Sequence, residues 1–111
     1  MEIQEQVQGA VTVLKPMGPL LEADAEHFKS RAMEVVGKNL GRVVVDASAI
    51  SFLDSRGIEA LVDVTDQISQ SGRALKLCTV NSTVRQILEL VGWDDAFEYF
   101  DDVGGGVRSF L

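Results

Sequence analysis

One stretch of this sequence combines residue types that could carry chemistry, Asp54-Ser55-Arg56-Gly57. It follows an apolar stretch typical of a buried strand and precedes the apolar spacing of an amphipathic helix. Ser55 should therefore lie at or beside a helix N-cap, where unpaired N–H groups and the helix dipole favour negative charge. The Ser55 hydroxyl is a candidate phosphate acceptor; the alternative is an Asp-Ser capping pair without any regulatory role.

Side chains near Ser55 could form a surface for a partner. Glu59 and Asp63 lie opposite the apolar stripe of the helix, although a solvated helix face explains them equally simply. A phosphate on Ser55 would add about -1.5 to -2 charges to this acidic surface and so change which partner docks there. Arg56 could fold back onto the phosphate or reach a partner's carboxylate, and it could also be a solvated arginine.

Catalysis has less support than binding. The only histidine, His27, falls beside the buried stripe of its predicted helix, and Ser55 lacks the preceding glycine of a nucleophile elbow. Cys78 ends a predicted buried strand and is interpreted as a structural thiol. A single histidine and a single cysteine give little basis for a transition-metal site. We therefore expect a protein that is not an enzyme, with no metal and no cofactor.

Two further clusters also have simple interpretations. The run Gly104-Gly105-Gly106 lacks the spacing of phosphate-binding loops and is interpreted as a loose C-terminal turn. An acidic cluster could bind a cation but is more typical of a solvated edge. It consists of Asp94, Asp95, Glu98, Asp101 and Asp102.

Length and charge restrict the class of protein. The 111 residues suit one domain covering 1–111, and 46% hydrophobic with 24% charged residues is ordinary for a globular protein. A net charge of -7 opposes binding to nucleic acid or to an anionic membrane. No apolar run approaches the roughly 20 residues that span a bilayer, and no apolar leader is evident. These features predict a cytoplasmic protein whose partners are proteins.

The elements that must position Ser55 follow from the spacing of apolar residues and from turn signals. Strands are predicted at 3–8, 11–14, 42–46, 74–79 and 96–100. Helices are predicted at 21–36, about 57–70 and 81–91, with a marginal helix after 103 because glycine weakens helices. Helices that alternate with strands predict an α/β fold, with a mixed, mainly parallel sheet of about five strands and three to four helices.

Over nearly its whole length, the chain resembles the STAS domain family, found in bacterial anti-sigma factor antagonists and in the cytosolic tails of sulphate transporters. The best match runs from VVVD at 43–46 through ISFLDSRGI at 50–58, similar to the family's strand, loop and D-S-x-G-[LI] helix start. Supporting matches are GPL at 18–20, SGRALKL at 71–77 and ILELVG at 87–92. The length is similar to that of the free-standing antagonists.

The resemblance implies a switch in transcription regulation. Antagonists of this kind bind an anti-sigma factor that is also a serine kinase; phosphorylation of the serine after the aspartate releases them, and a phosphatase resets them. The matching acceptor is Ser55, and the matching partner surface is roughly 51–66 with 18–24. The partner-binding residues implied are Asp54, Arg56, Gly57, Ile58, Glu59, Asp63, Leu21 and Asp24.

Two positions differ from the family's usual pattern. Arg56 stands where Ser or Thr is common, and Leu21 stands where Asp is frequent, with Asp24 one turn later. Two other functions stay open. One is a STAS accessory subunit of a transport or envelope-maintenance complex that is never phosphorylated, and the other is a sensor of a small ligand or nucleotide.

Overall fold

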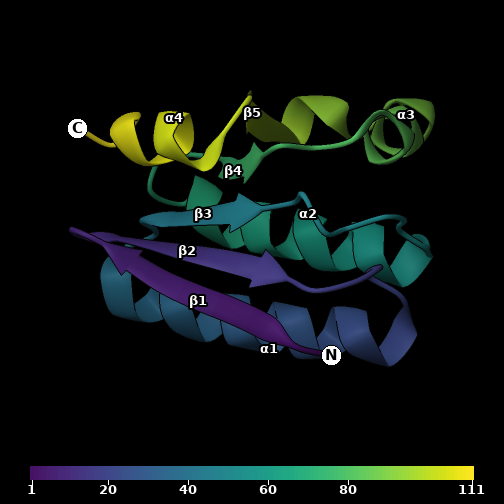
Figure 1. Cartoon of the computed structure of the whole chain (residues 1–111), viewed down its shortest axis with the longest axis horizontal. Helices are drawn as coiled ribbons and strands as arrows, with labels where there is room; N and C mark the ends of the chain where they lie inside the picture. The colour runs from purple at the N-terminus through teal and green to yellow at the C-terminus, as the bar shows by residue number, and fades with distance from the viewer.

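Five strands form one mixed sheet in the order β1-β2-β3-β4-β5 in this computed structural model, which describes residues 1–111 (Figure 1). The strands are β1 (Ile3–Gln8), β2 (Val11–Pro16), β3 (Val43–Asp46), β4 (Leu75–Cys78) and β5 (Phe97–Phe100). β1 pairs antiparallel with β2, and every other neighbouring pair is parallel. The predicted mainly parallel sheet is confirmed, and every predicted strand is present.

The helices lie on both sides of the sheet (Figure 1). They are α1 (Glu22–Asn39), α2 (Ser55–Ser69), α3 (Ser82–Leu90) and α4 (Val103–Arg108), with a short 3-10 turn at Asp94–Ala96. The long helices α1 and α2 pack against each other, whereas α4 lies against β3, β4 and β5. None of these helices has the combination of length and apolar sequence needed to cross a membrane.

The main core lies between the sheet and the pair α1 and α2. Phe28 of α1 and Leu61 of α2 meet Leu14 and Val45 of the sheet there, and all four are almost fully buried. These core residues recur with two different periods. In a helix every third or fourth side chain lies on the same side, whereas in a strand successive side chains point to opposite faces of the sheet. This packing holds both helices against the same face of the sheet.

The C-terminal glycines allow close packing and do not form the loose turn expected from the sequence. The Asp102 side chain accepts a hydrogen bond from the Gly105 N–H at 2.7 Å and begins α4. A Cβ atom on Gly106 would lie 2.6 Å from the Cys78 sulfur, so only glycine lets α4 approach β4 this closely. The marginal helix predicted after 103 is present. The loose turn expected for its glycines was wrong, because tertiary contacts outweigh the low helix propensity of glycine.

Cys78 and part of the acidic cluster take part in packing and in contacts within the chain. Burial raises the pKa of the Cys78 thiol to about 11, which agrees with a structural thiol. Within the acidic cluster, Glu98 pairs with Lys76 at 2.6 Å and Asp102 caps α4. Only part of this cluster is therefore a solvated edge.

Candidate functional site

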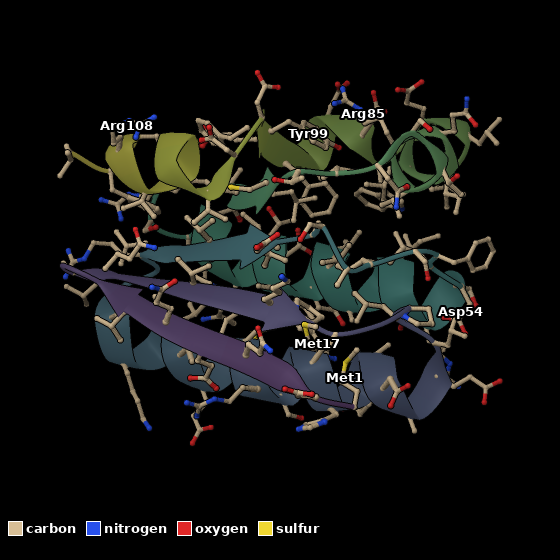
Figure 2. All side chains as sticks on the ribbon, viewed as in Figure 1. Met1, Met17, Asp54, Arg85, Tyr99 and Arg108 are labelled. Atoms are coloured by element: carbon tan, nitrogen blue, oxygen red, sulfur yellow. The ribbon has the colours of Figure 1, made fainter.

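The candidate site lies at one end of the molecule, where Asp54 is labelled in Figure 2. The chain leaves β3 there, passes through a loop and enters α2, and the loop from β2 enters α1 beside it (Figure 1). Loops that follow the carboxyl ends of parallel strands commonly carry the functional groups of α/β proteins. Two loops distant in sequence thus form one surface.

Backbone hydrogen bonds join these two loops. The Leu20 N–H donates to the Phe52 carbonyl at 3.1 Å, and the Asp54 N–H donates to the Leu20 carbonyl at 3.3 Å. Leu20 and Leu53 form a parallel β-bridge, and both side chains are buried in the main core. The start of α1 and the start of α2 are therefore held together as one unit.

Asp54 is the N-cap of α2 and also contacts the start of α1. One carboxylate oxygen accepts the Gly57 N–H at 2.8 Å, and the other accepts the Glu22 N–H at 3.1 Å. The Asp54 carbonyl also accepts the Ile58 N–H at 3.0 Å. The sequence correctly placed Ser55 beside an N-cap, but the capping side chain is that of Asp54.

Ser55 is the first residue of α2, and its side chain is exposed. Its hydroxyl makes no hydrogen bond to another group of the protein, and the helix is capped by Asp54. The N–H groups of Ser55 and Arg56 are also unpaired, as expected for the first turn of a helix. The hydroxyl is thus exposed and lies next to N–H groups that favour negative charge.

Gly57 determines how closely α2 approaches the neighbouring loop. Its backbone is buried, and a Cβ atom there would overlap the Leu20 carbonyl oxygen. A glycine is needed at this position although its φ is ordinary for a helix. The role that the structure gives Gly57 is therefore positioning, and its contact with a partner stays a prediction. The following residue, Ile58, packs partly against the main core.

Carboxylates surround Ser55. Glu22, Glu26 and Asp54 line an open depression with Ser55 and Arg56. The sequence interpretation missed Glu22 and Glu26, although their spacing of four residues places them on one face of α1. Predicted residue Glu59 is exposed and lies next to the same depression, in the groove between α1 and α2.

Two of the other predicted partner contacts, Asp63 and Asp24, already form ion pairs within the chain. Asp63 forms an ion pair with Lys29 at 2.9 Å, which joins α2 to α1 and raises the pKa of Lys29 above its ordinary value. The Asp24 carboxylate lies 3.3 Å from the Met1 amino group. Leu21 is the half-buried N-cap residue of α1 and makes no side-chain capping bond. These residues border the site, and their contact with a partner stays a prediction.

Comparisons with known proteins show the family and the fold of this chain. The family model described as STAS domain matches residues 2–105. The anti-sigma-F factor antagonist RsfB of Mycobacterium tuberculosis is 32% identical over 102 residues, which cover 89% of this chain and 83% of RsfB. The match therefore covers most of the length of both proteins.

Solved structures share the fold. An anti-sigma-factor antagonist (STAS) domain protein from Planctomyces limnophilus superposes with a TM-score of 0.82 at 20% identity, covering 98% of this chain and 97% of that one. The anti-sigma factor antagonist SpoIIAA in its unphosphorylated form gives 0.79 at 14% identity, covering 98% and 96%. Bacillus SpoIIAA in the phosphorylated form gives 0.73 at 14% identity, covering 99% and 100%.

Proposed function

This chain belongs to the STAS domain family, and from that premise we propose that it is a phosphorylation-gated anti-sigma factor antagonist. In this proposal it acts in the cytoplasm as a regulator of transcription without enzymatic activity. It binds an anti-sigma factor that is also a serine kinase, leaves it when Ser55 is phosphorylated, and is reset by a phosphatase. The observation that carries the proposal is the exposed Ser55 hydroxyl, which is unbonded and directly follows the N-cap Asp54.

The relatives support the choice of partner class. RsfB, which shares 32% identity, is named an anti-sigma-F factor antagonist. SpoIIAA, which shares the fold, has been solved in both an unphosphorylated and a phosphorylated form. A serine at the start of α2 that is free of internal bonds is what such a modification requires.

The charge distribution suggests how the switch would operate. A phosphate adds about -1.5 to -2 charges at a helix start, where the dipole and the unpaired N–H groups of Ser55 and Arg56 favour it. The same phosphate lies beside the Glu22 and Glu26 carboxylates, so the docking surface becomes more negative and costlier to desolvate. The modification should therefore act on partner binding and leave the fold intact.

Arg56, the residue after Ser55, gives the surface a positive charge that can bind either the partner or the phosphate. Arg56 is exposed at the rim of the same depression and is a cation close to the acceptor. In the unmodified protein it is available to a carboxylate of the partner. After phosphorylation it can bind the phosphate, which would remove it from the partner and reinforce release.

A comparison of four tagged chains expressed in the native cells tests the proposal. Wild type and Ser55→Ala should retain the same ATPase of the kinase class, whereas Ser55→Asp should lose it. Mass spectrometry of the wild type should find phosphate on Ser55. Ser82→Asp is the matched control, because Ser82 is the exposed first residue of α3, directly after its N-cap Asn81.

The opposite pattern would contradict the proposal. Equal retention by Ser55→Ala and Ser55→Asp, with Ser55 unmodified, would favour an accessory subunit that is never phosphorylated. Loss of the partner with the Ser82→Asp control as well would show that added charge disturbs binding at any helix start.

A further inference from the structure

β1 forms an edge of the sheet that no other part of the chain pairs with. It lies at the end of the strand order, with β2 on one side only (Figure 1). All of its residues are exposed or half-buried, and the apolar residue Val7 is 72% exposed. A free edge of this kind is a template for another strand.

The hairpin geometry decides which backbone groups are free. Gln8 pairs with Val11 across the two-residue connection, so the even-numbered residues of β1 direct their N–H and C=O groups toward β2. The Met17 N–H, which donates to the Glu2 carbonyl at 2.9 Å, continues this pattern. The N–H and C=O groups of Ile3, Glu5 and Val7 therefore point away from the sheet.

Most of the features that normally keep an edge strand from pairing with another strand are absent from β1. Its sequence, IQEQVQ, contains no proline and no lysine, and its pairing with β2 is regular without a bulge. Its single charge, on Glu5, is neutralised by Arg31 of α1, whose Nη2 donates to the carboxylate at 2.7 Å. Charge therefore does little to keep a second strand away.

We propose that β1 pairs antiparallel with β1 of a second copy of this chain, around a two-fold axis at Gln6. In this register Gln6 faces Gln6 of the other copy, Gln4 faces Gln8, and Glu5 faces Val7. The outward N–H and C=O groups of Glu5 and Val7 then meet those of the other copy. The result is a continuous sheet through both copies.

Side-chain charges disfavour the neighbouring register, with its axis one residue earlier. An axis at Glu5 would place two carboxylates directly opposite each other, which is unfavourable. An axis at Gln6 places only neutral amides opposite one another on that side, and each amide can both donate and accept a hydrogen bond. It also places Val7 beside the neutralised pair of Glu5 and Arg31. The surface is thus complementary to itself, as a two-fold interface requires.

The area involved predicts a weak dimer. One six-residue strand buries less than the roughly 1,200–2,000 Å² of a standard stable interface. We therefore expect monomer and dimer to exchange, with the dimer populated at high protein concentration. Phosphorylation of Ser55 is not needed for this association, so it can be tested independently of the proposed function.

Cysteine cross-linking of the full chain tests the register. The two Gln6 residues would form a non-hydrogen-bonded pair with Cα atoms about 4.5 Å apart, within disulfide range. Gln6→Cys should therefore form a disulfide dimer under mild oxidation. Gln4→Cys is the matched control on the same face; it should remain monomeric alone and cross-link when mixed with Gln8→Cys. The buried Cys78 should not contribute, which the wild type checks.

Charge reversal at the axis gives a second test by sedimentation velocity. Gln6→Lys alone and Gln6→Glu alone should each weaken dimerisation about two- to fivefold, and an equal mixture of the two should restore it. A wild type that stays monomeric up to millimolar concentration would overturn the proposal. Cross-linking of Gln4→Cys alone as readily as Gln6→Cys would also overturn it. So would binding of extended peptides to the β1 edge by a wild type that forms no dimer.

Discussion

The Asp54 carboxylate accepts a hydrogen bond from the Glu22 N–H at 3.1 Å, across 32 residues of sequence. Glu22 has φ 44, a left-handed conformation that non-glycine residues seldom adopt, and it is the first residue of α1. The same carboxylate caps α2 through the Gly57 N–H. Asp54 thus fixes the start of one helix relative to the other, which presents Ser55 on a preorganised surface.

Removing the Asp54 carboxylate should destabilise the fold. Asp54→Ala loses both hydrogen bonds and should lower the free energy of unfolding by about 1–2 kcal/mol. Asp54→Asn can still accept the Gly57 N–H but places an NH₂ group toward the Glu22 N–H. It should therefore lower the free energy of unfolding less than Asp54→Ala does. Urea unfolding of both variants measures the difference. An unchanged midpoint for Asp54→Ala would contradict the role of Asp54 as the joint cap.

Gly57→Ala should destabilise the protein although alanine favours helices. Its Cβ would overlap the Leu20 carbonyl oxygen, which is backbone and cannot move aside without breaking the loop pairing. We expect a loss of about 2 kcal/mol or more in the free energy of unfolding. The control is Gly37→Ala in α1, where a Cβ meets nothing within 4 Å, and it should stabilise by up to about 1 kcal/mol. Similar values for the two variants would rule out the close approach.

Local patterns in the sequence are sufficient to predict the helices and strands but not the contacts between them. Apolar spacing predicts the five strands and the helices α1 to α3, with α4 only as a marginal helix, and the Asp-Ser pair places Ser55 beside a cap. The hydrogen bonds that join Leu20 to Phe52 and Asp54 link residues far apart in sequence, so no periodicity reveals them. The packing role of Gly106 was missed for the same reason, since it depends on Cys78 of another element.

The fit of Gly106 against Cys78 predicts a coupled pair of substitutions. Gly106→Ala alone should lower the free energy of unfolding by about 1–3 kcal/mol, because its Cβ would lie 2.6 Å from the sulfur. Cys78→Ala removes that sulfur, so the double variant should lose less than the sum of the two single variants. A double-mutant cycle in urea checks this. Simple additivity would mean that Gly106 is needed for another reason, such as its contact with Val44.

The buried Cys78 thiol should make stability depend on alkaline pH. Burial raises its folded-state pKa to about 11 from 9.0, so the unfolded chain loses this proton first as the pH rises. The free energy of unfolding should therefore fall between about pH 9 and 11, by about 2–3 kcal/mol from this group. Burial also raises the pKa of Tyr99, which acts in the same direction. Comparing wild type with Cys78→Ala across this range isolates the thiol; parallel curves would contradict its contribution.

A negative charge at Ser55 should leave the fold intact. The unpaired N–H groups and the dipole of α2 favour the charge by about 0.3–1 kcal/mol, while Glu22 and Glu26 across the depression oppose it. We therefore expect Ser55→Asp to change the free energy of unfolding by no more than about 0.5 kcal/mol. Ser82→Asp, at the equivalent position of α3, should behave similarly. Urea unfolding of the two variants measures this, and a Ser55→Asp protein that is markedly less stable would mean that any loss of partner reflects unfolding and not a switched surface.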